Sequence, residues 1–371
     1  MNLSSIPEKK RFHFIDQFRG LVVIFMLVDH SSYFLNSLWL HFNPFDPLFD
    51  SWAQFALRYV SYLCAPGFLM INGAMVWWAY HRKINQGSPD WTVRRQLIQR
   101  ALFLILLQIT WVNSSWGGFS SFQPWHFGII SCIGLSMIMQ TAIVGLRWQV
   151  QLVIALGILA IHPFLLNIPY DPEIMWEQAL MQTFIDSGKF NKYPVIPWFA
   201  VAIIGSVMAN GWLSAWKTDK QRILMGFSIG AAAIFLAIII RMSRGYGNIF
   251  PFSDFGSYSF FFDQKYPPSL YFSLWFIGLV VLSISLLIVI GKAAPKLLTI
   301  PDIVGKVPLF FYGMHIAILG VFSKRIGLFY REGDVTSTLI GVVIMMAVMI
   351  PLSRWFYGVK SRSKNFIIRM L

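Results

Sequence analysis

The chain has 371 residues, of which 56% are hydrophobic and 12% are charged, and its formal net charge is +14. A soluble domain of this length carries about 25% charged residues, so the composition excludes an ordinary soluble enzyme. The basic residues lie in short loops between apolar runs, where they set orientation, so the charge does not indicate nucleic-acid binding. Apolar runs of about 20 residues recur along the chain, long enough to cross a bilayer as helices. An all-α, polytopic membrane protein is therefore predicted.

The apolar runs predict a bundle of about ten transmembrane helices. They lie near residues 18–39, 54–80, 97–113, 127–146, 149–167, 194–214, 222–241, 269–291, 307–323 and 336–357. Counted on alternate sides of these spans, the 30 lysines and arginines divide into 21 on the side of the N-terminus and 9 on the other. Because cytoplasmic loops carry the excess of basic residues, both termini are predicted to be cytoplasmic. One membrane domain then accounts for residues 1–371, with short basic tails at 1–17 and 358–371.

The first span contains the run FRGLVVIFMLVDH, with ionisable side chains at Arg19, Asp29 and His30. Arg19 and His30 are eleven residues apart, close to three helical turns, so they share one face about 16 Å apart along the axis. Ionisable residues within a span are costly and suggest a pathway or a site. A neutral imidazole can take a proton near neutral pH, so His30 is a candidate general base. Asp29 points about 100° away from His30 and is not automatically its partner.

His41 lies a further eleven residues along the chain. Pro44 and Pro47 follow it and indicate a loop rather than a continued helix. His41 is therefore expected at or near the outer mouth of the bundle.

Polar residues also mark later spans. Arg58 begins the second span on the outer side, where it would either clamp an acidic acceptor or the carbonyl region of the donor, or anchor the interface. Lys265 precedes two prolines that stiffen the entry to the eighth span, and it would either hold a phosphate or carboxylate or remain solvated. Ser269 can cap that span. His315 lies within the ninth span, where it indicates either a cavity wall or a structural hydrogen bond.

The cytoplasmic loop 81–100 is strongly basic and includes Arg94 and Arg95. It would either attract the phosphates of coenzyme A or set topology and contact anionic lipid. The sequence contains no glycine-rich nucleotide loop, no Cys-x-x-Cys and no His-Glu-x-x-His. Neither nucleotide hydrolysis nor a metal site is therefore predicted.

Several segments resemble a single family. IDQFRGLVVIFMLVDH (15–30) and RYVSYLCAPGFLMINGAMVWW (58–78) are similar to the catalytic membrane domain of the heparan-alpha-glucosaminide N-acetyltransferase family, particularly its bacterial members. The likeness continues in WHFGIISCIGLSMI (125–138), YPVIPWFAVAIIG (193–205), KYPPSLYF (265–272) and VPLFFYGMHIAI (307–318), and it covers residues 11–358.

The resemblance implies transfer of an acyl group, usually acetyl from cytoplasmic acetyl-CoA, to an amine or hydroxyl on the far side of the membrane. The family is similar in layout to bacterial acyltransferases that O-acylate surface glycans. Those enzymes carry an arginine, ten intervening residues and a histidine in the first span, and Arg19 and His30 fit that spacing. The lysosomal members of the family carry their active-site histidine where His41 falls. The catalytic histidine is thus His30 by one comparison and His41 by the other.

The resulting hypothesis is a multi-pass acyltransferase of the bacterial cytoplasmic (inner) membrane. The predicted cofactor-binding residues are Arg19, Arg94 and Arg95, and the predicted substrate-binding residues are Arg19, Asp29, Arg58, Lys265, Ser269 and His315. Acetyl-CoA is the predicted acyl donor, and no metal is predicted. The predicted partners are acyl-CoA, a sugar or glycan acceptor and the lipid bilayer, without nucleic acid, and a homodimer stays open. The alternative is a transporter or flippase of a small polar or lipid-linked substrate, which intramembrane charges would also suit.

Overall fold

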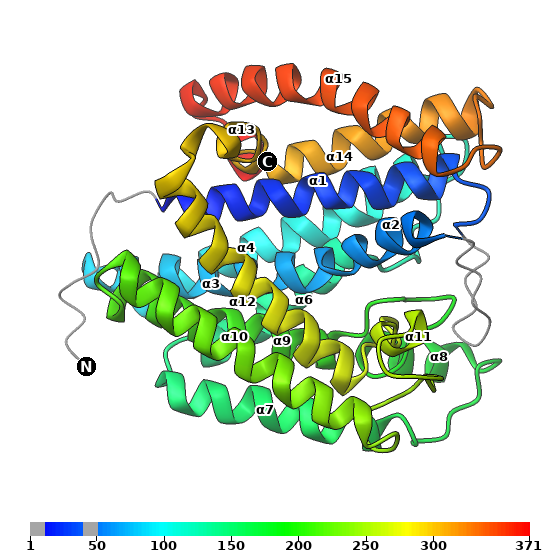
Figure 1. The fold of residues 1–371 in the computed structure, drawn as a ribbon. Helices are drawn as coiled ribbons and strands as arrows, with labels where there is room; N and C mark the ends of the chain where they lie inside the picture. Colours follow the sequence, from blue (N-terminus) through cyan, green and yellow to red (C-terminus); the bar gives the residue numbers. More distant parts are fainter. Residues whose placement is uncertain (1–11, 40–50) are drawn as a thin grey trace.

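The computed structural model describes residues 12–39 and 51–371, and these described residues form helices without a β-strand (Figure 1). The elements are α1 (His13–Leu35), α2 (Trp52–Tyr62), α3 (Cys64–Asn85), α4 (Asp90–Leu107), η1 (Gln108–Val112), α5 (Asn113–Trp116), α6 (Ile129–Ile143), α7 (Trp148–Leu165), α8 (Met175–Phe184), α9 (Val195–Ala209), η2 (Asn210–Ala215), α10 (Asp219–Met242), α11 (Tyr258–Phe261), α12 (Leu270–Ala293), η3 (Pro295–Leu298), α13 (Thr299–Gly305), α14 (Pro308–Leu319), η4 (Gly320–Arg325), α15 (Val335–Arg362) and α16 (Phe366–Met370).

The prediction of a polytopic helical membrane protein is confirmed. Among the described residues, eight helices are long and apolar enough to cross a membrane, and a ninth crossing would be the pair Pro295–Gly305 and Pro308–Arg325, bent by 75°. The remaining predicted span corresponds to α6, whose 15 residues cover about 22 Å. α6 is short because the chain before it, at 117–128, forms turns beside the cavity described below. The bend falls before Pro308, which lacks a backbone N–H and starts a new helix.

Helix α1 runs through the middle of the bundle. It contacts α2, α3, α12, α13, α14 and α15, so its outer half can bring its side chains close to residues distant in sequence. Around it, α3 packs on α9, α7 packs on α9, and α10 packs on α12. The helices α7, α10 and α15 leave many large apolar side chains exposed, as expected for surfaces that face lipid.

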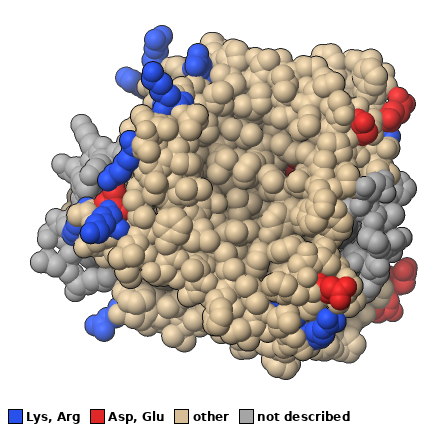
Figure 2. Space-filling model, in the orientation of Figure 1, with Lys and Arg blue, Asp and Glu red and all other residues tan. Residues whose placement is uncertain are grey.

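The two ends of the bundle differ in charge. α1 begins and α15 ends at the left of Figure 1, and most of the Lys and Arg visible in Figure 2 lie at that end. Asp and Glu lie mostly at the opposite end, and the face between is nearly free of charge (Figure 2). Because basic residues are retained on the cytoplasmic side, we call the left end the cytoplasmic end and the right end the outer end.

Within the part of the chain that the structure describes, three segments wind as π-helices, namely η1, η2 and η4. A π turn fits one extra residue into the winding and is frequent at functional sites. η1 continues α4 and is followed at once by α5, and η4 continues α14. Both lead to the outer end, where their side chains line the cavity described below.

Helices α3 and α9 approach each other so closely that two positions admit glycine alone. A Cβ atom at Gly73 would overlap the backbone carbonyl oxygen of Ala202, and one at Gly205 would overlap that of Met70. Small residues allow such backbone approach between membrane helices, where van der Waals packing drives association.

Gly73→Ala and Gly205→Ala are therefore each expected to destabilise the bundle by about 1–3 kcal/mol, because the helices must separate to admit the methyl group. Thermal unfolding of the purified protein in detergent would measure the loss. Gly157→Ala on α7 is the matched control, since nothing lies within 4 Å of a Cβ there. Equal unfolding midpoints for Gly73→Ala and Gly157→Ala would contradict the prediction.

Candidate active site

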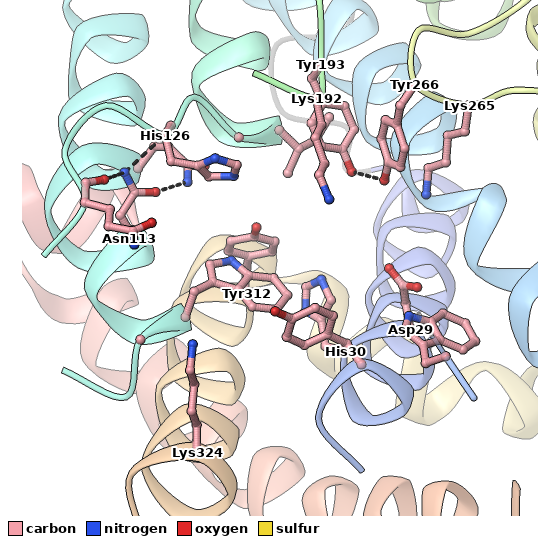
Figure 3. Close-up of a pocket in the computed structure, with 18 of the residues that line it drawn as sticks. Asp29, His30, Asn113, His126, Lys192, Tyr193, Lys265, Tyr266, Tyr312 and Lys324 are labelled. Atoms are coloured by element: carbon pink, nitrogen blue, oxygen red, sulfur yellow. Dashed lines mark hydrogen bonds between the residues drawn. The ribbon is translucent and has the colours of Figure 1, made fainter. Parts of the chain in front are cut away.

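A cavity of about 350 Å³ lies at the outer end of the bundle (Figure 3). Its walls are the outer half of α1, the second half of α2, η1 with α5 and the turns at 117–128, together with side chains from α14, η4 and two loops. Its volume falls within the range of small-molecule binding sites.

Four of the predicted site residues lie around this cavity. Asp29 and His30 come from α1, Arg58 comes from α2, and Lys265 comes from the loop that precedes α12. The structure brings them together because α1 contacts both α2 and α12. Their chemical roles stay predictions.

His30 forms a close pair with His315 of α14. The Nδ1 atom of His30 lies 2.6 Å from Nε2 of His315, and the two rings are nearly parallel, with centroids 4.9 Å apart and planes at 10°. The Nδ1 atom of His315 lies 2.7 Å from the carbonyl oxygen of Phe311. His315 is fully buried and does not line the cavity, so it lies behind His30 rather than beside the ligand space.

Aromatic rings hold His30 on its other sides. The ring of Trp116 meets it edge-on at a centroid distance of 4.8 Å, and the ring of Tyr312 does so at 5.8 Å. Both aromatic residues also line the cavity. The imidazole is thus fixed in orientation while one of its edges remains beside the ligand space.

Positive charge dominates the cavity wall. Among the lining residues the structure describes, Arg58, Lys192, Lys265 and Lys324 are cations, and Asp29 is the one carboxylate. The ammonium group of Lys265 is buried and lies 5.0 Å from the ring of Tyr62 and 5.1 Å from that of Tyr266. This excess of cations favours a ligand with an anionic group.

Arg58 is held by an indole. Its guanidinium lies 4.4 Å from the ring centroid of Trp39 and donates a hydrogen bond of 3.2 Å to the Trp39 carbonyl oxygen. These contacts aim a planar cation along the cavity wall, where it could meet a carboxylate or phosphate.

Two side-chain amides, at η1 and the start of α5, hold the cavity wall that faces Asp29 and Lys265 (Figure 3). Nε2 of Gln108 donates to Oδ1 of Asn113 (2.8 Å), and Nδ2 of Asn113 donates to the carbonyl oxygens of Gln123 (2.8 Å) and His126 (3.0 Å). These bonds hold the turns at 117–128 against the start of α5. Figure 3 shows the bond between Asn113 and the backbone of His126. Burial and the nearby charge of Lys192 lower the pKa of His126, which favours its neutral form.

Two tyrosines join the loops that cover the cavity. The hydroxyl groups of Tyr193 and Tyr266 are 2.7 Å apart, as the dashed line in Figure 3 marks. Tyr193 follows Lys192, and Tyr266 follows Lys265, so this hydrogen bond fixes both lysines at the same side of the cavity.

A buried arginine positions the loop that carries Lys265. The side chain of Arg241, on α10, is fully buried and donates hydrogen bonds of 2.6–3.1 Å to the carbonyl oxygens of Phe250, Ser259, Phe260 and Phe262 and to Oδ1 of Asn248. Its guanidinium also lies 3.4 Å from the Asp263 carboxylate. The loop from 243 to 268 is therefore wrapped around one cation, and Lys265 stands two residues beyond its last contact.

The other predicted site residues lie elsewhere. Arg19 pairs with Asp16, three positions before it on α1, at 3.4 Å, and it lines a separate cavity at the cytoplasmic end. Arg94 bonds Asp90 at 2.7 Å and the carbonyl oxygen of Thr141. Arg95 is exposed on α4.

Ser269 caps α12, as the sequence predicts, by accepting a hydrogen bond from the Phe272 N–H at 3.0 Å, and it does not line the cavity of His30. His41 lies outside the described residues. Among the residues that line the cavity, Lys192, Tyr193, Lys324 and Asn113 were not predicted.

The fold and the site together define the class of a multi-pass membrane protein with an enzyme-like polar cavity. The sequence profile described as heparan-alpha-glucosaminide N-acetyltransferase, catalytic, matches residues 11–244, well over half of the chain. The chain belongs to this family, as predicted from its sequence, and the family is one of acetyltransferases. A search of curated proteins gives no significant match. The matched range includes Asp29, His30 and Arg58 and ends before Lys265 and His315. The evidence that Lys265 and His315 lie beside these residues therefore comes from the structure and not from the family match.

Proposed function

We propose that this protein transfers an acyl group, acetyl in the first instance, from cytoplasmic acyl-CoA to an amine or hydroxyl of a sugar or glycan on the outer side of a bacterial cytoplasmic membrane. The proposal rests on the position of His30, which lines a polar cavity at the outer end of the helical bundle. The chain also belongs to an acetyltransferase family.

The chemistry would centre on Nε2 of His30, because Nδ1 is engaged by His315. As a general base, Nε2 takes a proton from the acceptor while the acceptor nitrogen or oxygen bonds to the acyl carbon. The bond from that carbon to sulfur breaks with its electron pair on sulfur, and the proton returns from Nε2 to the thiolate. As an acyl carrier, Nε2 would instead attack the thioester itself and pass the acyl group on.

The cavity wall suits a sugar acceptor. Trp116 and Tyr312 offer ring surfaces beside His30, and the amide of Asn113 and the lysine side chains offer hydrogen bonds. A hydrophobic and aromatic wall with a few placed polar groups is typical of small-molecule sites. The four cations further favour an acceptor that carries a carboxylate or phosphate.

The donor would have to reach this cavity from the cytoplasmic end. The cytoplasmic cavity lined by Asp16 and Arg19 measures about 140 Å³ and, among the described residues, shares no lining residue with the outer cavity. Between them, Val22, Val23 and Met26 of α1 are buried. Delivery of the thioester to His30 would therefore require the helices around α1 to separate, with Arg19, Arg94 and Arg95 as the residues predicted to bind the coenzyme A phosphates.

The direct test uses the purified protein in liposomes with radiolabelled acetyl-CoA on one side and glucosamine, neutral hexoses or acidic sugars on the other. Label on an acceptor across the bilayer would support the proposal. Folded protein that neither binds acetyl-CoA nor labels any acceptor would contradict it. Net movement of a sugar without acylation would instead favour the alternative of a transporter or flippase.

Lys265→Gln is expected to lower kcat/KM for an acidic acceptor by roughly 10-fold to 100-fold, because a charge-assisted hydrogen bond contributes about 1.5–3 kcal/mol. The loss for a neutral acceptor should be smaller. Steady-state kinetics with a uronic acid and its neutral hexose would measure both. Lys220→Gln, at an exposed lysine of the cytoplasmic end, is the control. Equal losses with the two acceptors would count against an anion-binding role.

A further inference from the structure

His30 and His315 belong to one hydrogen-bonded chain that ends on a backbone carbonyl. Its links are His30 Nδ1 to His315 Nε2 (2.6 Å) and His315 Nδ1 to the Phe311 carbonyl oxygen (2.7 Å). On this geometry, and resting on the proposed function of His30, we propose that His315 is a positioning residue that fixes the tautomer and orientation of His30 for acyl transfer.

The direction of the chain follows from its last member. A carbonyl oxygen can only accept a hydrogen bond, so Nδ1 of His315 carries a proton. In a neutral imidazole the other nitrogen is then an acceptor, so Nε2 of His315 accepts from His30. The proton of neutral His30 therefore sits on Nδ1, and its Nε2 carries the free lone pair. This assignment rests on the partners, in the usual way for histidine.

The free lone pair lies where the ligand would be. His30 lines the cavity and, within residues 12–39 and 51–371, its side chain makes no hydrogen bond other than the one to His315. The opposite tautomer would leave two lone pairs facing each other across 2.6 Å. His315 thus holds His30 in the form that can accept a proton from, or attack, a group in the cavity.

His315 can act only through His30. Its side chain is fully buried and absent from the cavity wall, so it does not contact a ligand there. When Nε2 of His30 takes a proton, the positive charge is shared along the chain toward the partly negative carbonyl oxygen of Phe311. The arrangement serves the same purpose as the third group of a hydrolase triad, which orients a histidine and stabilises its charged form.

The test compares three substitutions of the full-length protein. His315→Leu removes the acceptor, and His315→Asn places its amide too far from His30. His315→Gln reaches the position of Nε2 with an amide oxygen that can accept from Nδ1 of His30. We expect kcat to fall roughly 100-fold or more in His315→Leu and His315→Asn, to recover within about tenfold in His315→Gln, and KM for the acceptor to change little.

His162→Leu is the matched control. His162 is a second buried histidine that bonds a backbone carbonyl, that of Ile185 at 2.8 Å, but it lies on α7 and not at this cavity. Its loss should leave kcat within about twofold of wild type. A folded His315→Leu protein with wild-type kcat would overturn the positioning role while the proposed function stood, whereas retained transfer in His30→Ala would overturn the proposed function itself.

A second measurement does not depend on activity or on the folding of His315 variants. Nitrogen-15 spectra of the histidine-labelled wild-type protein report which ring nitrogen is protonated, and the signals lost in His30→Ala identify His30. Protonated Nδ1 with unprotonated Nε2 at His30 is the expected result. The reverse tautomer, or a charged His30 at neutral pH, would overturn the inference.

Discussion

Replacement of His30 by alanine is expected to abolish acyl transfer, with kcat reduced roughly 1,000-fold or more. The reason is that Nε2 of His30 is the basic atom presented to the cavity, and proton transfer by a positioned group contributes about 10²–10⁴-fold to rate, with a further gain if the acyl group is carried covalently. The measurement is single-turnover transfer of radiolabelled acetyl from acetyl-CoA to an acceptor. Incubation of wild-type protein without acceptor would separate the two routes, since only the acyl carrier retains label.

Two further histidine variants distinguish His30 from the other candidate histidines. His126→Ala removes another imidazole of the same cavity, one held by turns rather than paired with His315, and its loss should reduce kcat much less. His41→Ala tests the residue that the family comparison offers as the alternative. Full activity of His30→Ala together with an inactive His41→Ala would show that His30 is not the catalytic histidine.

Arg241→Leu is expected to prevent stable folding of the outer end, at a cost of about 3–5 kcal/mol or more. The guanidinium satisfies four carbonyl oxygens, one amide oxygen and the Asp263 carboxylate in a fully buried setting. Removal of one partner of a buried ion pair leaves an uncompensated charge, and each orphaned carbonyl adds its own desolvation cost. Thermal unfolding in detergent and the yield of monodisperse protein would measure the loss.

Arg244→Asn is the control for that experiment. Arg244 follows Arg241 by three residues and also bonds loop carbonyls, those of Phe252 and Ser253 at 3.0 Å, but it is exposed. Its φ of 56° is a left-handed conformation that asparagine tolerates better than most residues. An unfolding midpoint of Arg241→Leu as high as that of Arg244→Asn would show that the loop does not depend on the buried cation.

The sequence predicted the helices well because span length and hydropathy follow directly from bilayer thickness. It also predicted that Asp29, His30, Arg58 and Lys265 are site residues, because a charged side chain within or beside an apolar run is costly unless it has a function. The structure places these four residues at one cavity. The pairing of His30 with His315 needed the structure. The two residues are separated by 285 positions, and nothing in either segment specifies that α1 and α14 are neighbours.

The cavity residues that were not predicted lack a sequence signal of their own. Lys192, Tyr193 and Lys324 occur at the outer ends of helices, where cations and tyrosines are common in any membrane protein. Asn113 was missed for a different reason. It follows Gln108 by five residues, a spacing that places two side chains about 140° apart on a regular α-helix, yet these two are hydrogen-bonded.

The π-helical turn at η1 explains that spacing and makes the site tolerant of one change in chain length. The turn absorbs one extra residue, so Asn113 returns to the face of Gln108. Deletion of a single residue between them would leave Gln108 and Asn113 four positions apart, the spacing that places two residues on one face of a regular α-helix. A one-position gap at this point in a related sequence is therefore expected to mark a helix without the π turn, with the side chains after it still directed to the cavity.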